Sequence, residues 1–174
     1  MFKKESFLFP NITWAFHAFP PVEKSEGNDL HEKWNDIKSY YPGDDYIDWI
    51  GLSVYGAVEP DSEWRSFTDI MDKAYPVITE ISHDKPMAVF EFGVAEYPQL
   101  GNKTEWIKNA LESLEDGRYP RIKAISYWDE IWKDHSSGKV IDLRINSSIM
   151  SSAMYRKILK IPLKIKIELD YREF

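Results

Sequence analysis

The sequence contains no cysteine, which excludes disulfide bonds and any metal site built on thiolates. It also has no apolar run of about 18 residues, so no membrane-spanning helix is predicted. Positive charge is scarce as well, because 22 Lys and Arg stand against 29 Asp and Glu, for a net charge of -7. Nucleic acids and anionic membranes bind clustered Lys and Arg, so we expect neither as a partner.

The first residues lack the features of a signal peptide. The segment MFKKESFLFPNITW has two lysines, but its apolar stretch is too short and no small-residue cleavage site follows. We therefore expect no signal peptide here, and the sequence does not determine a cellular location.

The residues that are present are typical of a folded globular domain. The chain has 174 residues, of which 43% are apolar and 15% aromatic. This length predicts one domain with a sizeable core. The aromatic content suits either that core or a stacking surface.

Strand patterns alternate with helix patterns along the chain. Apolar segments rich in β-branched and aromatic residues predict strands at 13–19, 47–55, 87–92 and 122–128. Helical spacing of apolar residues predicts helices at 30–37, 66–81, 106–114 and 149–159. This alternation predicts an α/β fold, with a parallel sheet of strands that are apolar on both faces and four strand-helix units.

The carboxyl-terminal residues break the alternation. LKIKIELDY, residues 163–171, alternates apolar and charged side chains, which predicts an extra strand with no helix after it. We therefore divide the chain into an α/β domain at residues 1–160 and a tail at residues 161–174.

Reactive and aromatic side chains stand where the predicted strands end. They are His17, then Ser53 and Tyr55, then Glu91, then Trp128 followed by Asp129 and Glu130. The carboxyl ends of parallel strands face the ligand side of such a sheet, so these groups should gather there. A carboxylate beside a phenol and an indole plane suits a sugar, because aromatic faces stack on its CH groups.

Other interpretations of the same residues stay open. The pattern also suits Glu91 as an exposed or ion-paired acid. It suits His17 as a hydrogen-bonded residue in the wall of a pocket. Tyr55 and Trp128 also fit core or rim aromatics. Asp44, Asp45 and Asp48 suit the capping of a turn, or else a cation site.

Three segments resemble successive strand motifs of glycoside hydrolase family 26, the β-mannanase-like enzymes. They are YYPGDDYIDWIGLSVYG at 40–56, KPMAVFEFG at 85–93 and IKAISYW at 122–128, and NITWAFHAFP at 11–20 looks like the strand before them. The resemblance implies a (β/α)8 barrel fold and retaining hydrolysis of β-1,4-linked polysaccharide, with mannan the best substrate guess. It implies that Glu91 is the nucleophile and that Tyr55 hydrogen-bonds its carboxylate. It also implies that Trp128 forms the floor of the subsite in which the sugar is attacked. His17 and Trp132 are further candidate substrate contacts, and neither a metal nor a cofactor is expected.

The resemblance covers strands five to eight of that barrel, its carboxyl-terminal half. A retaining glycosidase needs two carboxyl groups about 5 to 5.5 Å apart. The family's acid lies in a His-Glu-x-Asn-Gly-like motif that this sequence lacks, and neither Glu32 nor Glu130 matches it. We therefore expect little or no hydrolysis by the chain alone, and self-association through exposed sheet edges and an exposed apolar inner face. A sugar-binding module without catalysis, or a truncated gene product without activity, are the alternatives.

Overall fold

The computed structural model describes residues 12–20, 36–135 and 138–158. Most of the predicted helix 30–37 and all of the tail at 161–174, with its predicted strand, lie outside these residues. In the part of the chain that is described, no helix has the length and apolar character needed to cross a bilayer.

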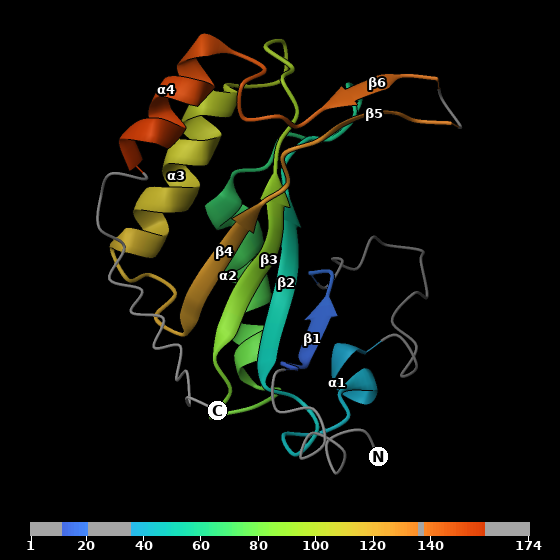
Figure 1. Ribbon diagram of the computed structural model, residues 1–174, viewed down its shortest axis with the longest axis vertical. Helices are drawn as coiled ribbons and strands as arrows, with labels where there is room; N and C mark the ends of the chain where they lie inside the picture. The colour runs from blue at the N-terminus through green and yellow to red at the C-terminus, as the bar shows by residue number, and fades with distance from the viewer. Residues whose placement is uncertain (1–11, 21–35, 136–137, 159–174) are drawn as a thin grey trace, which may run out of the picture.

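The strands predicted at the four apolar segments form one sheet, and every neighbouring pair in it is parallel (Figure 1). Their order follows the chain: β1 (Ala15–Ala18), β2 (Trp49–Tyr55), β3 (Met87–Gly93) and β4 (Ile122–Tyr127). The predicted parallel sheet is confirmed. Neighbouring parallel strands in chain order, joined by helices, are the building pattern of a (β/α)8 barrel.

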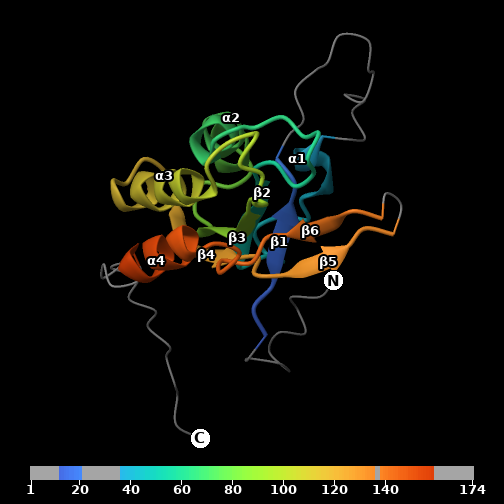
Figure 2. The ribbon, with the colours of Figure 1, turned by 90° about the horizontal axis from the view of Figure 1, so that it is seen from above.

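Helices cover one side of this sheet. They are α1 (Ile37–Tyr40), α2 (Phe67–Thr79), α3 (Lys103–Glu115) and α4 (Ile149–Ile158). Figure 2 shows α2 and α3 side by side on the same face of the sheet, with α4 next to α3. The α/β fold predicted from the alternation is therefore correct.

Local sequence signals explain where the two long helices begin and end. Ser66 caps α2 by accepting a hydrogen bond from the Asp69 backbone N–H at 3.0 Å, and the Asp69 carboxylate accepts one from the Ser66 N–H at 2.9 Å. This reciprocal pair is the predicted capping box. Beyond α3, Gly117 has a φ of 74°, a left-handed conformation that glycine adopts without steric cost.

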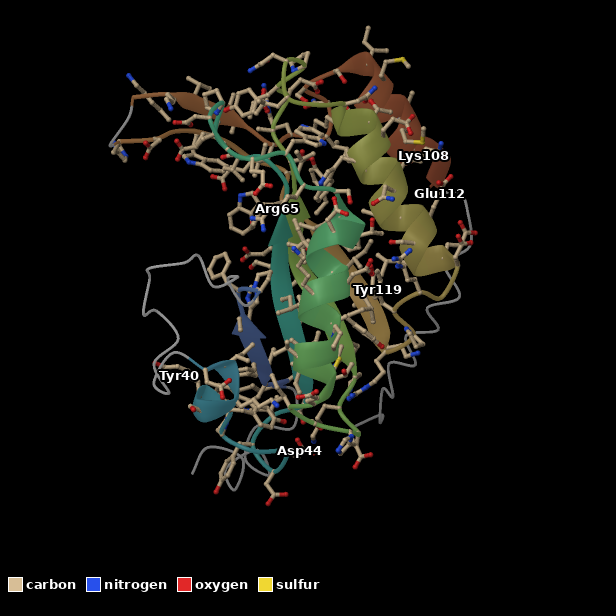
Figure 3. All side chains as sticks on the ribbon, turned by 180° about the vertical axis from the view of Figure 1, so that it is seen from behind. Tyr40, Asp44, Arg65, Lys108, Glu112 and Tyr119 are labelled. Carbon is tan, nitrogen blue, oxygen red and sulfur yellow. The ribbon has the colours of Figure 1, made fainter. Side chains whose placement is uncertain are left out.

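The core lies between these helices and the sheet face toward them. Phe67 of α2 is fully buried, and its ring makes edge contacts with Phe92, Trp106 and Tyr119 at centroid distances of 6.1, 5.9 and 6.3 Å. Tyr119 lies among the helices in Figure 3. The contacts join α2, α3, β3 and the α3–β4 connection, so this aromatic cluster holds the helix layer on the sheet.

The opposite face of the sheet carries polar side chains beside the apolar ring of Phe90. His17 pairs with Gly51 and Ser53 pairs with Glu91, whereas Leu52 and the other alternate residues of β2 enter the core. The inner face that the sequence predicts to be apolar is therefore mixed: His17, Ser53 and Glu91 are polar, whereas the Phe90 ring over Gly51 is apolar. Self-association through the edges at β1 and β4 stays a prediction.

A hairpin that the sequence reading missed interrupts the last strand-helix unit. Strands β5 (Ile131–Lys133) and β6 (Val140–Asp142) pair antiparallel between β4 and α4. Figure 1 shows the hairpin beyond the arrowheads of the parallel sheet. It therefore lies at the end of the sheet where ligand sites are expected.

The acidic turn before β2 has a structural role at the other end of the sheet. Asp44 accepts hydrogen bonds from the hydroxyls of Tyr41 and Ser82, and Asp48 accepts one from the Trp14 N–H at 2.9 Å. Figure 3 shows Asp44 at the end of the molecule opposite the hairpin. Of the two interpretations of these acids, the contacts support the structural one for Asp44 and Asp48.

Gly51 allows an aromatic ring to cross β2. A Cβ at this position would lie 2.1 Å from the Phe90 ring and 2.9 Å from the Ala88 carbonyl oxygen. We expect Gly51→Ala to lower the free energy of unfolding by about 1 to 3 kcal/mol, through overpacking. At Gly93 an added Cβ meets nothing closer than 3.7 Å, so Gly93→Ala should change it by only about 0.5 kcal/mol. Urea denaturation measures both, and equal losses would contradict the proposed clash.

Candidate active site

An irregularity in β3 turns Glu91 toward the inner face. Leu52 pairs with Val89, but Ser53 pairs with Glu91, so Phe90 is an extra residue on β3. Val89 and Phe92 both stay in the core although they are three residues apart. Such a bulge re-aims side chains, and here it places two consecutive residues outside the helix-covered core. This explains why a carboxylate interrupts an otherwise apolar strand.

Two hydroxyl groups of β2 hold the Glu91 carboxylate. The Tyr55 hydroxyl donates to Glu91 Oε2 at 2.9 Å, and the Ser53 hydroxyl donates to the same oxygen at 3.0 Å. Among the described residues, no Lys or Arg forms an ion pair with Glu91. The carboxylate is therefore held by neutral donors. The hydrogen bond from Tyr55 to Glu91 that the family resemblance implied is present.

His17 contributes to the same group of side chains from β1. Its Nε2 lies 2.8 Å from Ser53 Oγ, and its ring makes an edge contact with Phe90 at a centroid distance of 5.3 Å. His17 thus contacts Ser53 rather than Glu91. Its predicted role as a substrate contact stays a prediction.

The two tryptophans occupy different environments. Trp128 follows β4 and is 37% exposed, with its backbone N–H bonded to the Phe92 carbonyl at 2.9 Å. That bond fixes its backbone next to the end of β3. Trp132, on the hairpin, instead packs against a second apolar cluster built on Ala95, Ile141 and Leu143. Both remain predicted substrate contacts, with Trp128 the more accessible.

The second apolar cluster also contacts Tyr55. Burial raises the pKa of the Tyr55 phenol above its ordinary value of 10.0, and the hydrogen bond to Glu91 and its negative charge raise it further. The phenol therefore stays protonated and keeps its donor function at neutral pH.

Glu91→Gln should lower the pKa of Tyr55, because the negative charge disappears. The pKa should still lie above the ordinary value, since burial is the largest cause of the shift. Ultraviolet titration of tyrosinate, with Tyr55→Phe subtracted, measures it. The control Glu80→Gln removes an exposed carboxylate that pairs with Lys38, so it should leave this titration unchanged. An unaltered Tyr55 titration in Glu91→Gln would contradict the 2.9 Å contact.

A buried lysine connects the loops around the carboxyl end of the sheet. Lys103, the first residue of α3, is 1% exposed and donates to the Arg144 carbonyl and the Ser147 hydroxyl, both at 2.8 Å. The Ser147 hydroxyl in turn donates to Glu96 at 3.0 Å. Burial lowers the pKa of Lys103 from 10.5 to about 8, although the charges of Glu96, Asp142 and Asp129 oppose the shift.

This shift predicts a stability change in mildly alkaline solution. Between pH 8 and 10.5 the unfolded chain holds the Lys103 proton while the folded chain has lost it. The free energy of unfolding should therefore rise with pH through this window, by about 3 kcal/mol in total. Lys103→Met should remove that rise, which urea denaturation at several pH values tests. If the free energy of unfolding depended on pH in the same way in wild type and Lys103→Met, the burial of a titrating amine would be contradicted.

In the described ranges, no group of His, Asp and Glu is arranged to hold a metal ion. The residues that meet at the carboxyl end are instead a carboxylate, hydroxyl donors, an imidazole and aromatic rings. Such a set can perform nucleophilic and hydrogen-bonding chemistry on an uncharged ligand with hydroxyl groups.

The fold and the site together define a parallel α/β sheet, built like part of a barrel, that presents a carboxylate at its carboxyl edge. No protein-family profile matches the chain. Curated relatives do match, and two of them are endoglucanase H of Acetivibrio thermocellus, 34% identical over 121 residues, and mannan endo-1,4-β-mannosidase A and B of Caldalkalibacillus mannanilyticus, 28% identical over 115 residues. These matches cover 68% and 66% of this chain, but only 12% and 20% of the relatives.

A solved structure shows the same fold. The family 26 endo-β-1,4-mannanase of Cellulomonas fimi superposes with a TM-score of 0.51 and 18% identity, over 85% of this chain and 30% of that one. The expected resemblance is confirmed: the curated relatives are polysaccharide-degrading enzymes, the solved structures with this fold are family 26 endo-β-1,4-mannanases, and both are consistent with half of a family 26 barrel domain.

Sequence reasoning did not recognise Ser53 as a partner of Glu91. Ser53 and Tyr55 are two residues apart on β2, so strand periodicity alone places both on one face. The bulge at Phe90 had no such signal, because it depends on how β3 pairs with β2.

Proposed function

We propose that Glu91 is the nucleophile of a retaining glycoside hydrolase site that acts on β-1,4-linked polysaccharide, with mannan the first candidate. The observation that carries this proposal is the Glu91 carboxylate, held by Tyr55 and Ser53 at the carboxyl edge of the sheet. The choice of mannan follows from the mannan-cleaving enzymes among the relatives.

In the proposed reaction, a Glu91 carboxylate oxygen attacks the anomeric carbon of the sugar. The bond from that carbon to the leaving oxygen breaks, and its electron pair departs with the leaving group. Water then cleaves the glycosyl ester, which restores the carboxylate and retains the anomeric configuration. Trp128, exposed beside the strand ends, supplies an aromatic face for the sugar ring.

A polysaccharide leaving group also needs a proton. General acid assistance is typically worth about 10² to 10⁴ in rate, and the second carboxyl group is the part that this sequence does not supply in the family's motif. The nucleophile half is therefore expected to react poorly with mannan itself. A leaving group that is a stable anion needs no such proton.

An activated substrate tests the nucleophile without requiring the acid. We expect 2,4-dinitrophenyl β-mannobioside to release one equivalent of dinitrophenolate per protein in a burst. Because the sequence does not contain the family's acid/base motif, we expect the glycosyl ester to persist, and mass spectrometry of peptides should find it on Glu91. Azide, which needs no base, should release it as a mannobiosyl azide.

A sugar-binding function without catalysis is the second candidate, and the exposed Trp128 favours it. In that case calorimetry would show mannohexaose binding that Trp128→Ala abolishes, while the activated glycoside gives no burst. If neither a burst nor binding heat is found, both functions are rejected for this chain.

A further inference from the structure

We propose that Ser53 and His17 are positioning residues that hold Glu91 Oε2 and leave Oε1 as the attacking atom. The inference rests on the proposed function and adds the parts of the chain that orient the nucleophile. It starts from a continuous line of contacts across three strands, from His17 on β1 through Ser53 on β2 to Glu91 on β3.

Proton counting gives this line a direction. A serine hydroxyl has one proton, and that of Ser53 is directed to Glu91 Oε2 at 3.0 Å. The 2.8 Å contact between Ser53 Oγ and His17 Nε2 therefore needs a proton from the imidazole. His17 must carry a hydrogen on Nε2, and its ring acts as the donor at the start of the line.

The surroundings restrict each member of the line. Ser53 is 1% exposed, so water does not compete for its hydroxyl. The His17 ring is exposed but rests with its edge against Phe90, the bulge residue next to Glu91. The same bulge thus aims the carboxylate and supports the imidazole that orients it.

The two carboxylate oxygens of Glu91 become unequal as a result. Oε2 accepts from both Ser53 and Tyr55, while Oε1 accepts no hydrogen bond from the described residues. In a retaining reaction one oxygen forms the glycosyl ester and the other becomes its carbonyl oxygen. The geometry assigns attack to Oε1 and the carbonyl to Oε2.

This assignment predicts which step the positioning residues affect. When the ester is cleaved, negative charge returns to the carboxylate, and donors on Oε2 stabilise it as it leaves. We expect Ser53→Ala to lengthen the lifetime of the trapped ester toward azide about tenfold, and His17→Ala about threefold. His17→Gln keeps a side-chain N–H donor and should restore much of the wild-type lifetime. Thr79→Ala removes a hydroxyl that donates to the Pro76 carbonyl at the end of α2, in the helix layer, and should have no effect.

A spectroscopic experiment tests the line of contacts from His17 through Ser53 to Glu91 without any substrate turnover. Long-range proton-nitrogen correlation at about pH 7.5, above the ordinary histidine range, reports which ring nitrogen carries the proton. Wild type should show His17 protonated on Nε2, with a proton protected from exchange that disappears in Ser53→Ala. His17→Gln assigns the signal.

The outcomes separate this inference from the proposed function. An unprotonated Nε2 in neutral His17 would overturn the inference, because Ser53 would then donate to His17 and not to Glu91. Equal ester lifetimes in wild type and Ser53→Ala would also overturn it. If no ester forms in wild type, the proposed function fails, while a protected Nε2 proton would still establish the hydrogen-bonded line.

Discussion

Glu91→Gln is expected to abolish the dinitrophenolate burst and the covalent label, a loss of at least about 10³-fold in the trapping rate. The amide keeps the size of the carboxylate but is a far weaker nucleophile, so the glycosyl bond has no attacking group. Stopped-flow absorbance of dinitrophenolate measures the rate. Mass spectrometry of the intact protein measures the label.

Two control variants test whether the loss of the burst is specific to Glu91. Glu96→Gln removes a carboxylate bonded to Ser147, so its burst should equal that of wild type. Glu130→Gln tests a second glutamate that follows a strand end. A burst that persists in Glu91→Gln and disappears in Glu130→Gln would show that the reactive carboxylate had been misassigned.

Phe67→Ala is expected to have the largest effect on stability, lowering the free energy of unfolding by about 3 to 5 kcal/mol. The ring is fully buried and contacts Phe92, Trp106 and Tyr119, so its removal leaves a cavity where the helix layer meets the sheet. A single domain has only about 5 to 15 kcal/mol in total, so this is a large share. Urea denaturation followed by tryptophan fluorescence measures the change.

Phe67→Leu is the matched control, because it keeps most of the apolar volume. We expect it to lower the free energy of unfolding by less than half as much as Phe67→Ala. Tyr40→Ala removes an exposed aromatic side chain and should change it by about 0.5 kcal/mol or less. A Phe67→Ala loss as small as that of Tyr40→Ala would mean that α2 does not pack on the sheet as described.

The alternating pattern was sufficient to predict the parallel sheet and helices α2, α3 and α4. β2 lies within the predicted segment 47–55, and α2 starts at the predicted cap, Ser66. These elements were predictable because apolar periodicity and capping are local properties of the chain. The hairpin at 131–142 was missed, because its strands have three residues each and show no clear period.

The candidate site was predicted in part. The contact between Tyr55 and Glu91 was expected from the family resemblance, and the structure contains it. Ser53 was noted at a strand end but not linked to Glu91, and His17 was assigned to substrate, whereas it contacts Ser53. Those contacts join residues 36 and 38 positions apart, so they depend on strand register and cannot be read from neighbouring residues.

The sequence alone determined that this chain forms parallel strands alternating with helices and that Glu91 interrupts an apolar strand near its carboxyl end. Hydrophobic burial drives both, and it acts through the spacing of apolar residues. Only the tertiary structure decided that Phe90 is an extra residue on β3, and with it which face Glu91 occupies and which hydroxyls reach Oε2. A bulge is set by the pairing of two strands packed on a common helix layer, so its position is a property of the assembled sheet.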